Sequence, residues 1–135
     1  MTDFVEVNTA DLVGAALDWA VAKAEGHQPL TMPMARVDYA VAVTTVDAEG
    51  KLTGFACRYS TEWSQGGPLI AKHRIDLTFD RDGLVFAYLC DQDGLELPSS
   101  NKWEAFGETH LIAACRAIVA SVLGETVSVP KELLS

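Results

Sequence analysis

The sequence is poor in basic residues. Its 10 lysines and arginines stand against 19 aspartates and glutamates, which gives a net charge of −9. A nucleic-acid-binding surface has to displace the counterions of the phosphates and needs excess positive charge, so we expect no nucleic-acid partner. The same acidic balance disfavours binding to an anionic membrane. Because the acidic residues are scattered along the chain, we interpret them as a solvated surface.

Cysteines and long apolar runs are also scarce. Cys57, Cys90 and Cys115 lie in apolar surroundings and show no Cys-x-x-Cys spacing, which indicates reduced, buried thiols rather than a disulfide framework. No stretch reaches the roughly 18 uninterrupted apolar residues that a membrane span needs. Residues 1–4 lack the basic and apolar regions of a signal peptide. We therefore expect a cytoplasmic protein.

The common catalytic motifs are missing. The chain has no G-x-S-x-G elbow, no G-x-x-x-x-G-K-[ST] loop and no H-E-x-x-H helix. His27, His73 and His110 are far apart in the sequence, and none has a second ligand at helical spacing. Cys57 and Cys115 sit in apolar patterns, where a thiol behaves as a small hydrophobe. The sequence therefore predicts a non-enzymatic protein with no cofactor and no metal.

The length of 135 residues suits a single globular domain, residues 1–135. Helical periodicity of the apolar residues predicts one helix over residues 12–25 and another over residues 111–123. Thr9 and Thr109 are suitable N-caps, and a glycine follows each helix as a stop signal. The many alanines of both helices predict close packing.

The strand signals lie between these helices. Residues 37–46 and 52–58 predict one hairpin, and residues 75–79 and 84–90 predict a second. Residues 91–107 are the least structured segment. We therefore predict an α+β fold, in which a mostly antiparallel sheet of two hairpins carries the N- and C-terminal helices on one face.

Residues 59–70, between the two hairpins, differ in composition from the rest of the chain. They combine aromatic rings, hydroxyls, an amide and a Gly-Gly-Pro in the order Tyr59, Ser60, Thr61, Trp63, Ser64, Gln65, Gly66, Gly67 and Pro68. A core needs only Leu, Ile and Val, whereas convergent aromatic and polar groups orient a bound partner. The segment is therefore the first candidate for a binding site.

Each group in this segment has a role in such a site. Tyr59 and Trp63 offer flat faces for stacking, and Ser60, Thr61 and Gln65 supply donors and acceptors. Gly66-Gly67 would allow positive φ and let backbone N–H groups approach a ligand, and a short helix starting at Pro68 would favour an anion there. The alternative is a capped turn whose aromatic rings plug the end of the sheet.

Three further residues are candidates outside this segment. Arg116 is the only charge in the apolar run 111–119. Its guanidinium either reaches solvent, pairs with an internal carboxylate, or enters a pocket as an anion clamp. Trp103 and Phe106 lie in a polar segment and are candidates for a lid or for contact with a partner protein.

Three segments resemble the NinX-like family of small phage and prophage proteins. These are residues 11–26, residues 59–70, and residues 109–119 with the tail 129–134. The central signature of the family often reads Tyr-Ser followed by Thr-Asp-Trp and Gly-Gly-Pro. Glu62 replaces its Asp, and His110 stands where the family often has Pro.

The resemblance implies a phage-borne accessory protein that acts in the cytoplasm of the bacterial host. One mechanism would be sequestration, in which the protein acts as a sponge that binds a phosphorylated, nucleotide-like immune signal without turning it over. Tyr59 and Trp63 would stack on the ligand, and Arg116 would hold its phosphate. The alternative is an inhibitor that docks on a host protein through its acidic surface and exposed aromatic residues. A sponge would gain from homo-oligomerisation, since pockets between subunits bury more ligand surface.

Overall fold

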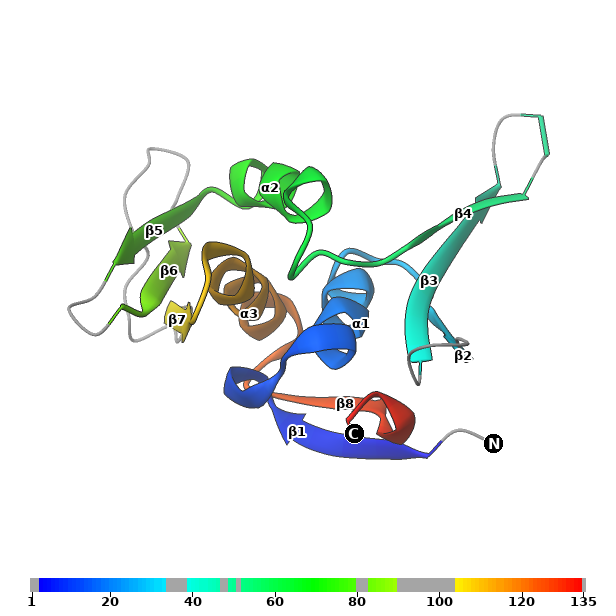
Figure 1. The fold of residues 1–135 in the computed structure, drawn as a ribbon, viewed down its shortest axis with the longest axis horizontal. Helices are drawn as coiled ribbons and strands as arrows, with labels where there is room; N and C mark the ends of the chain where they lie inside the picture. Colours follow the sequence, from blue (N-terminus) through cyan, green and yellow to red (C-terminus); the bar gives the residue numbers. More distant parts are fainter. Residues whose placement is uncertain are drawn as a thin grey trace.

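Two alanine-rich helices, α1 (Gly14–Ala24) and α3 (His110–Leu123), pack against each other at the centre of the molecule (Figure 1). This computed structural model describes residues 3–33, 39–46, 49–50, 52–79, 83–89 and 104–134. The close packing predicted from the alanines is confirmed, because α1 and α3 contact each other and several alanines of each helix are buried. They include Ala16, Ala20, Ala113, Ala114 and Ala117.

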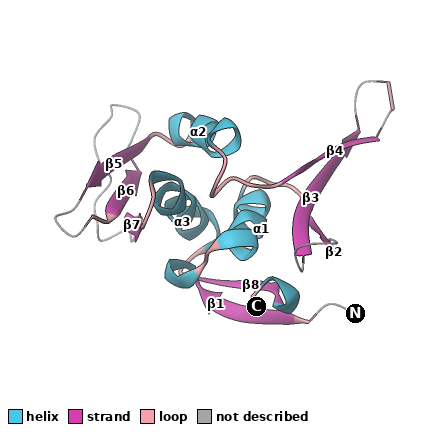
Figure 2. Ribbon diagram, in the orientation of Figure 1, coloured by secondary structure: helices cyan, strands magenta, loops and turns pink. Residues whose placement is uncertain are grey.

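The described strands form three antiparallel sheets around the helices (Figure 2). They are β1 (Phe4–Asn8) with β8 (Thr126–Pro130); β2 (Leu30–Pro33), β3 (Tyr39–Val46) and β4 (Leu52–Ala56); and β5 (Ile75–Phe79), β6 (Val85–Leu89) and β7 (Glu104–Gly107). The α+β class and both predicted hairpins are confirmed. The hairpins belong to separate sheets rather than one, because α1 packs beside β3 while α3 packs beside β6 and β7.

The β5–β6–β7 sheet carries α3 on one face only. Ile75, Val85 and Ala87 point from this sheet into the core and are buried. The alternate residues point to the other face, so Phe86 and Tyr88 lie away from the helices. β3 and β4 extend from α1 away from the rest of the molecule (Figure 1).

Two of the predicted helix starts differ from the structure. Thr9 does not cap α1; it begins the 3-10 turn η1 (Thr9–Asp11), where its hydroxyl donates to the Gly124 carbonyl at 2.7 Å. Its N–H donates to the Glu125 carbonyl at 2.8 Å, so Thr9 fastens the end of α3 to the β1–β8 ribbon. By contrast, the predicted cap at Thr109 is confirmed, because its side chain accepts the N–H of Ile112 at 3.1 Å.

The second difference concerns residues 63–72, which form the helix α2 (Trp63–Lys72). Pro68 lies inside this helix, so the expectation that a short helix would start at Pro68 is wrong. Gly66 and Gly67 are helical rather than in a loop with positive φ, which corrects the second expectation for this segment. The helix starts five residues before Pro68, and in its first turn the Gly66 N–H donates to the Glu62 carbonyl at 2.9 Å.

The C-terminal ends of α1 and α2 are joined by a charged cluster. Glu25 accepts from Lys72 at 2.6 Å and contacts His73 at 2.7 Å. Burial of the Glu25 carboxyl opposes its ionisation, but the two hydrogen bonds outweigh this and hold its pKa below the ordinary value. Within the described residues, no helix is long and apolar enough to cross a membrane. The predicted lid residue Trp103 lies outside the described residues, as do residues 91–102.

Candidate functional site

The first half of the segment 59–70 faces the interior. Ser60 is buried, and both its N–H and its hydroxyl donate to Oδ1 of Asp18, at 2.8 and 2.7 Å. Asp18 itself is buried in the middle of α1. These two hydrogen bonds fasten the start of the segment to the central helix, which is a structural role for Ser60.

The carboxyl of Asp18 is costly to ionise. Burial raises its pKa to about 6, although the two bonds from Ser60 and the positive charge of Arg58 act in the opposite direction. The same burial raises the pKa of the Cys57 thiol to about 11, with the nearby Asp18 charge adding to the effect. Burial also raises the pKa of Cys115. Both thiols therefore stay protonated near neutral pH and are weak nucleophiles.

Two other residues of the segment brace its own backbone. Gln65 accepts the N–H of Arg58 at 2.7 Å and donates to the Ala56 carbonyl at 2.8 Å, so its amide holds α2 to the chain that leaves β4. Gly66 is buried between the backbone at Tyr59 and the helix α3. A Cβ at this position would collide with the Tyr59 carbonyl oxygen and with Leu111 of α3. Glycine is required here for close packing rather than for ligand approach.

The remaining residues of the segment divide between core and surface. Tyr59 is buried in the core, so its ring offers no open face for stacking. Thr61 is exposed and its N–H donates to the Arg58 carbonyl at 3.1 Å. Gly67 lies under the Trp63 ring, where a Cβ would make ordinary contact at 3.5 Å. Trp63 is the large side chain of the segment that faces solvent, with 57% of its surface exposed.

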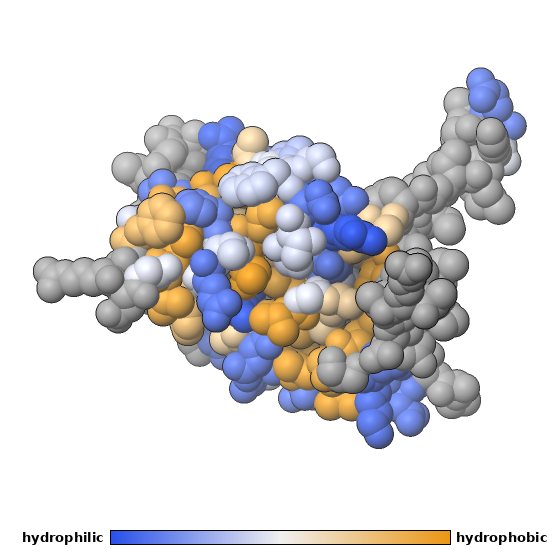
Figure 3. All heavy atoms as spheres, in the orientation of Figure 1, coloured by the Kyte–Doolittle hydropathy of each residue, from blue (hydrophilic) through white to orange (hydrophobic). Residues whose placement is uncertain are grey.

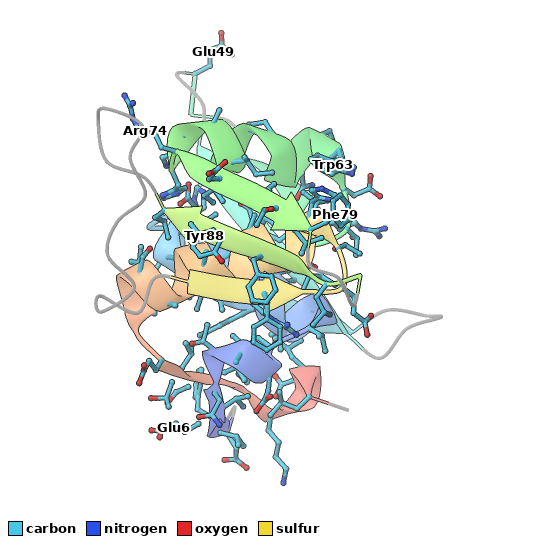
Figure 4. All side chains as sticks on the ribbon, turned by 90° about the vertical axis from the view of Figure 1, so that its left-hand side faces the viewer. Glu6, Glu49, Trp63, Arg74, Phe79 and Tyr88 are labelled. Atoms are coloured by element: carbon cyan, nitrogen blue, oxygen red, sulfur yellow. The ribbon has the colours of Figure 1, made fainter. Side chains whose placement is uncertain are left out.

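Trp63 belongs to an exposed aromatic group at one corner of the molecule. Its ring centroid lies 6.1 Å from that of His110, the first residue of α3. Phe79, the last residue of β5, is packed edge-on with the His110 ring at a centroid distance of 4.8 Å and is 67% exposed. Figure 4 shows Trp63 and Phe79 at the same edge of the molecule. We call Trp63, Phe79 and His110 the aromatic corner.

The corner is built where three elements end. α2 begins at Trp63, α3 begins at His110 and β5 ends at Phe79. The exposed residues Glu62 and Glu108 precede the two helices in the chain. Glu108 also lines the pocket of Arg116 described below. The corner thus has three rings at its centre and an acidic residue shortly before each of its helices.

Arg116 lies apart from the residues of the segment 59–70, in a pocket of about 240 Å³. Its Nε donates to the Leu12 carbonyl at 2.9 Å and its Nη1 to the Phe106 carbonyl at 2.8 Å. Burial lowers the pKa of the guanidinium, while the charges of Asp11 and Glu108 act in the opposite direction. Arg116 therefore ties the segment before α1 and the strand β7 to α3.

The structure thus separates the predicted site residues. No residue of the segment 59–70 lines the pocket of Arg116, whose walls come from Val13, Leu84, Phe106, Gly107, Glu108, Ile112 and Arg116 itself. Phe106, predicted as a partner contact, is 45% exposed at the mouth of this pocket. The described residues contain no cluster of three or more His, Cys, Asp or Glu side chains that could hold a metal ion.

Sequence reasoning missed two of the three residues in the aromatic corner. Phe79 continues the apolar alternation of Ile75 and Leu77, so its pattern is typical of a core strand. It is nevertheless exposed, at the last position of β5 beside His110. The one sequence signal for His110 was its departure from the family pattern at the first residue of a helix.

Comparison with protein families supports the resemblance. The family model described as Bacteriophage P22, NinX matches residues 8–122 and so covers most of the 135 residues. The chain belongs to this NinX family. A comparison with curated proteins found no match. The NinX match includes all three parts of the aromatic corner and the whole of the segment 59–70, so both lie within the region that the family shares.

Proposed function

We propose that this NinX-family protein is a phage accessory protein that binds a host protein through the aromatic corner and catalyses no reaction. The observation that carries the proposal is the exposure of Trp63 and Phe79 in a pre-arranged cluster. Tryptophan is enriched among the residues that dominate the binding energy of protein interfaces. Rings held by each other lose little freedom when a partner arrives, which favours tight binding.

Charge supports a protein partner over a phosphorylated one. Glu62 and Glu108 stand at the starts of α2 and α3, beside Trp63 and His110. A phosphate at this corner would approach a chain with a net charge of −9, which disfavours an anionic ligand. A protein surface with apolar residues surrounded by Lys or Arg complements this arrangement.

Binding of a nucleotide-like ligand at the same corner is the second candidate. It is supported by the open face of Trp63, on which a base can stack, and by the two helix N-termini that meet beside it. Three polar side chains of the segment 59–70 contribute little, because Ser60, Gln65 and Tyr59 are engaged within the protein. The ligand would have to bind mainly by stacking.

The test compares three proteins as bait in extracts of the bacterial host. They are the unaltered chain, the double variant Trp63→Ser/Phe79→Ser, and the control Val122→Ser. Val122 is 51% exposed near the end of α3, so it matches the exposure of Trp63 without belonging to the corner. We expect one stoichiometric host protein, identified by mass spectrometry, that the control retains and the double variant loses.

A panel of mono-, di- and cyclic nucleotides in a thermal-shift assay tests the second candidate. A ligand that binds only the folded state raises the midpoint as its concentration increases. A shift that disappears in Trp63→Ser, with no captured protein, would replace the proposed function by ligand sequestration. Turnover of any nucleotide in the panel would contradict the non-catalytic proposal.

A further inference from the structure

The pocket next to the aromatic corner is not used by either candidate function. Its walls are mainly apolar and come from separate parts of the chain: Val13 before α1, Leu84 before β6, Phe106 in β7 and Ile112 in α3. Gly107, the last residue of β7, and Glu108, which follows it, also line the pocket and lead to His110 of the corner. Pocket and corner therefore share the junction between β7 and α3.

The floor of this pocket is held in place by packing and hydrogen bonds. Gly107 is so close to α3 that a Cβ there would lie 2.9 Å from the Ala113 nitrogen and 2.6 Å from the Ile112 side chain. Arg116 bonds two backbone carbonyls from different elements. A wall fixed in this way is pre-organised, so little freedom is lost when a group enters.

The size of the pocket selects the kind of group that fits. Its volume of about 240 Å³ lies below the roughly 300–1,000 Å³ of sites that enclose whole drug-sized molecules. One large apolar side chain from a protein fills such a space, and interface hot spots commonly sit in pockets of this kind. A nucleotide is too large and too polar for these walls.

An apolar surface continues from the pocket over the sheet. Phe106 contacts Phe86 with ring centroids 5.8 Å apart, and Phe86 lies 6.5 Å from Tyr88 in a stacked arrangement. Tyr88 lies on the sheet face that is turned towards the viewer in Figure 4. Figure 3 shows apolar side chains reaching the surface beside β5 and β6. A partner segment could thus extend from the pocket along aromatic rings.

The charges around the pocket favour basic residues on either side of the side chain that enters it. Asp11 and Glu108 lie close enough to act on Arg116, whose guanidinium already bonds two carbonyls. The two carboxylates outnumber the one guanidinium, so the charge around the pocket is negative. The chain as a whole is also negative. Lys or Arg residues flanking an apolar side chain match this rim.

We infer that the pocket lined by Val13, Leu84, Phe106 and Ile112 is the anchor site for a basic segment of the partner protein that inserts one large apolar side chain. This inference rests on the proposed function, because it assigns the partner's chemistry at the same surface. The aromatic corner supplies the neighbouring contact, and the pocket supplies specificity for an aromatic or large aliphatic residue.

The test titrates three blocked peptides into the methyl-labelled protein and follows its NMR spectrum. The peptides are acetyl-Arg-Lys-Phe-Lys-Arg-amide, the same peptide with Ala in place of Phe, and acetyl-Glu-Asp-Phe-Asp-Glu-amide. We expect the first to shift the methyl signals of Val13, Leu84 and Ile112 and to bind at least about ten-fold more tightly than the other two. A tenfold difference corresponds to about 1.4 kcal/mol.

Two variants complete the test. Val13→Arg places a long cation across the pocket mouth at a position that is 55% exposed, so the fold tolerates it, and Val122→Arg is the control with the same charge change elsewhere. We expect Val13→Arg to abolish the methyl shifts and the control to keep them. Equal affinity of the three peptides, or unchanged binding to Val13→Arg, would overturn the inference. Loss of host-protein capture in Trp63→Ser/Phe79→Ser would still support the proposed function in that case, so the two failures are distinguishable.

Discussion

Replacement of Asp18 by Asn tests the interior role assigned to the first half of the segment 59–70. Asp18 is 6% exposed, and its carboxyl accepts two hydrogen bonds from Ser60. Its pKa is raised from 3.8 to about 6 by burial. A raised carboxyl pKa means that the folded state holds the proton more tightly than the unfolded chain. Asp18 therefore destabilises the protein above pH 6, and this cost disappears as the pH falls towards 3.8.

The raised pKa of Asp18 sets the size of the change in the free energy of unfolding. Each tenfold change in proton affinity is worth about 1.4 kcal/mol, so a shift from 3.8 to about 6 corresponds to about 3 kcal/mol in total. About 1.4 kcal/mol of this is recovered between pH 8 and pH 5. Asn keeps an oxygen for Ser60 and does not titrate, so position 18 adds no pH dependence to the stability of the Asp18→Asn variant.

The assay is urea unfolding from pH 5 to pH 8, followed by tryptophan fluorescence, because Trp19 is buried in α1. The free energy of unfolding of the unaltered protein minus that of Asp18→Asn should rise by about 1.4 kcal/mol as the pH falls from 8 to 5. Taking the difference removes the titration of Glu25, which both proteins share. A flat difference, or one that falls with decreasing pH, would refute the buried Asp18–Ser60 pair.

Three further predictions concern single contacts. Gly66→Ala should lower the free energy of unfolding by about 1–3 kcal/mol in urea titrations, because the new Cβ collides with the Tyr59 carbonyl oxygen; an unchanged midpoint would contradict the close packing. Arg116→Met should cost about 1–3 kcal/mol in the same assay by leaving two backbone carbonyls without their donor, and stability equal to the unaltered protein would show that these bonds contribute nothing. The lowered pKa of Glu25 stabilises the fold above its ordinary pKa of 4.5, and this contribution is lost as the pH falls through the lowered value. Glu25→Gln should therefore lose stability at pH 7, where the Glu25 carboxylate bonds His73, and differ less from the unaltered protein in acid; a gap that widens in acid would contradict the assignment.

Local patterns in the sequence were enough to predict most of the elements. Apolar spacing gave both long helices, and the turn signals gave both hairpins. The cap at Thr109 was predicted correctly because capping depends only on neighbouring residues. The order of the sheets was not predictable in this way, because the helices separate the two hairpins through contacts that are distant in the sequence.

The segment 59–70 shows where composition misleads. Its Gly-Gly suggested a loop with positive φ before a short helix starting at Pro68, yet all three residues lie inside α2, where Gly66 packs closely against Tyr59 and α3. The same hydroxyl and amide groups that suit a ligand also suit an internal brace, and only the fold shows which partner they meet. Asp18, which binds Ser60, gave no signal because it sits among apolar residues of a helix.

The proposed function requires that Trp63 contact the protein partner. The most direct measurement is the dissociation constant of the purified host partner for the unaltered protein, for Trp63→Ala and for Val122→Ala, by isothermal titration calorimetry. Truncation of a hot-spot residue costs at least about 2 kcal/mol, so we predict binding weakened about thirty-fold or more by Trp63→Ala. Val122→Ala should bind like the unaltered protein. Equal dissociation constants for all three proteins would contradict the claim.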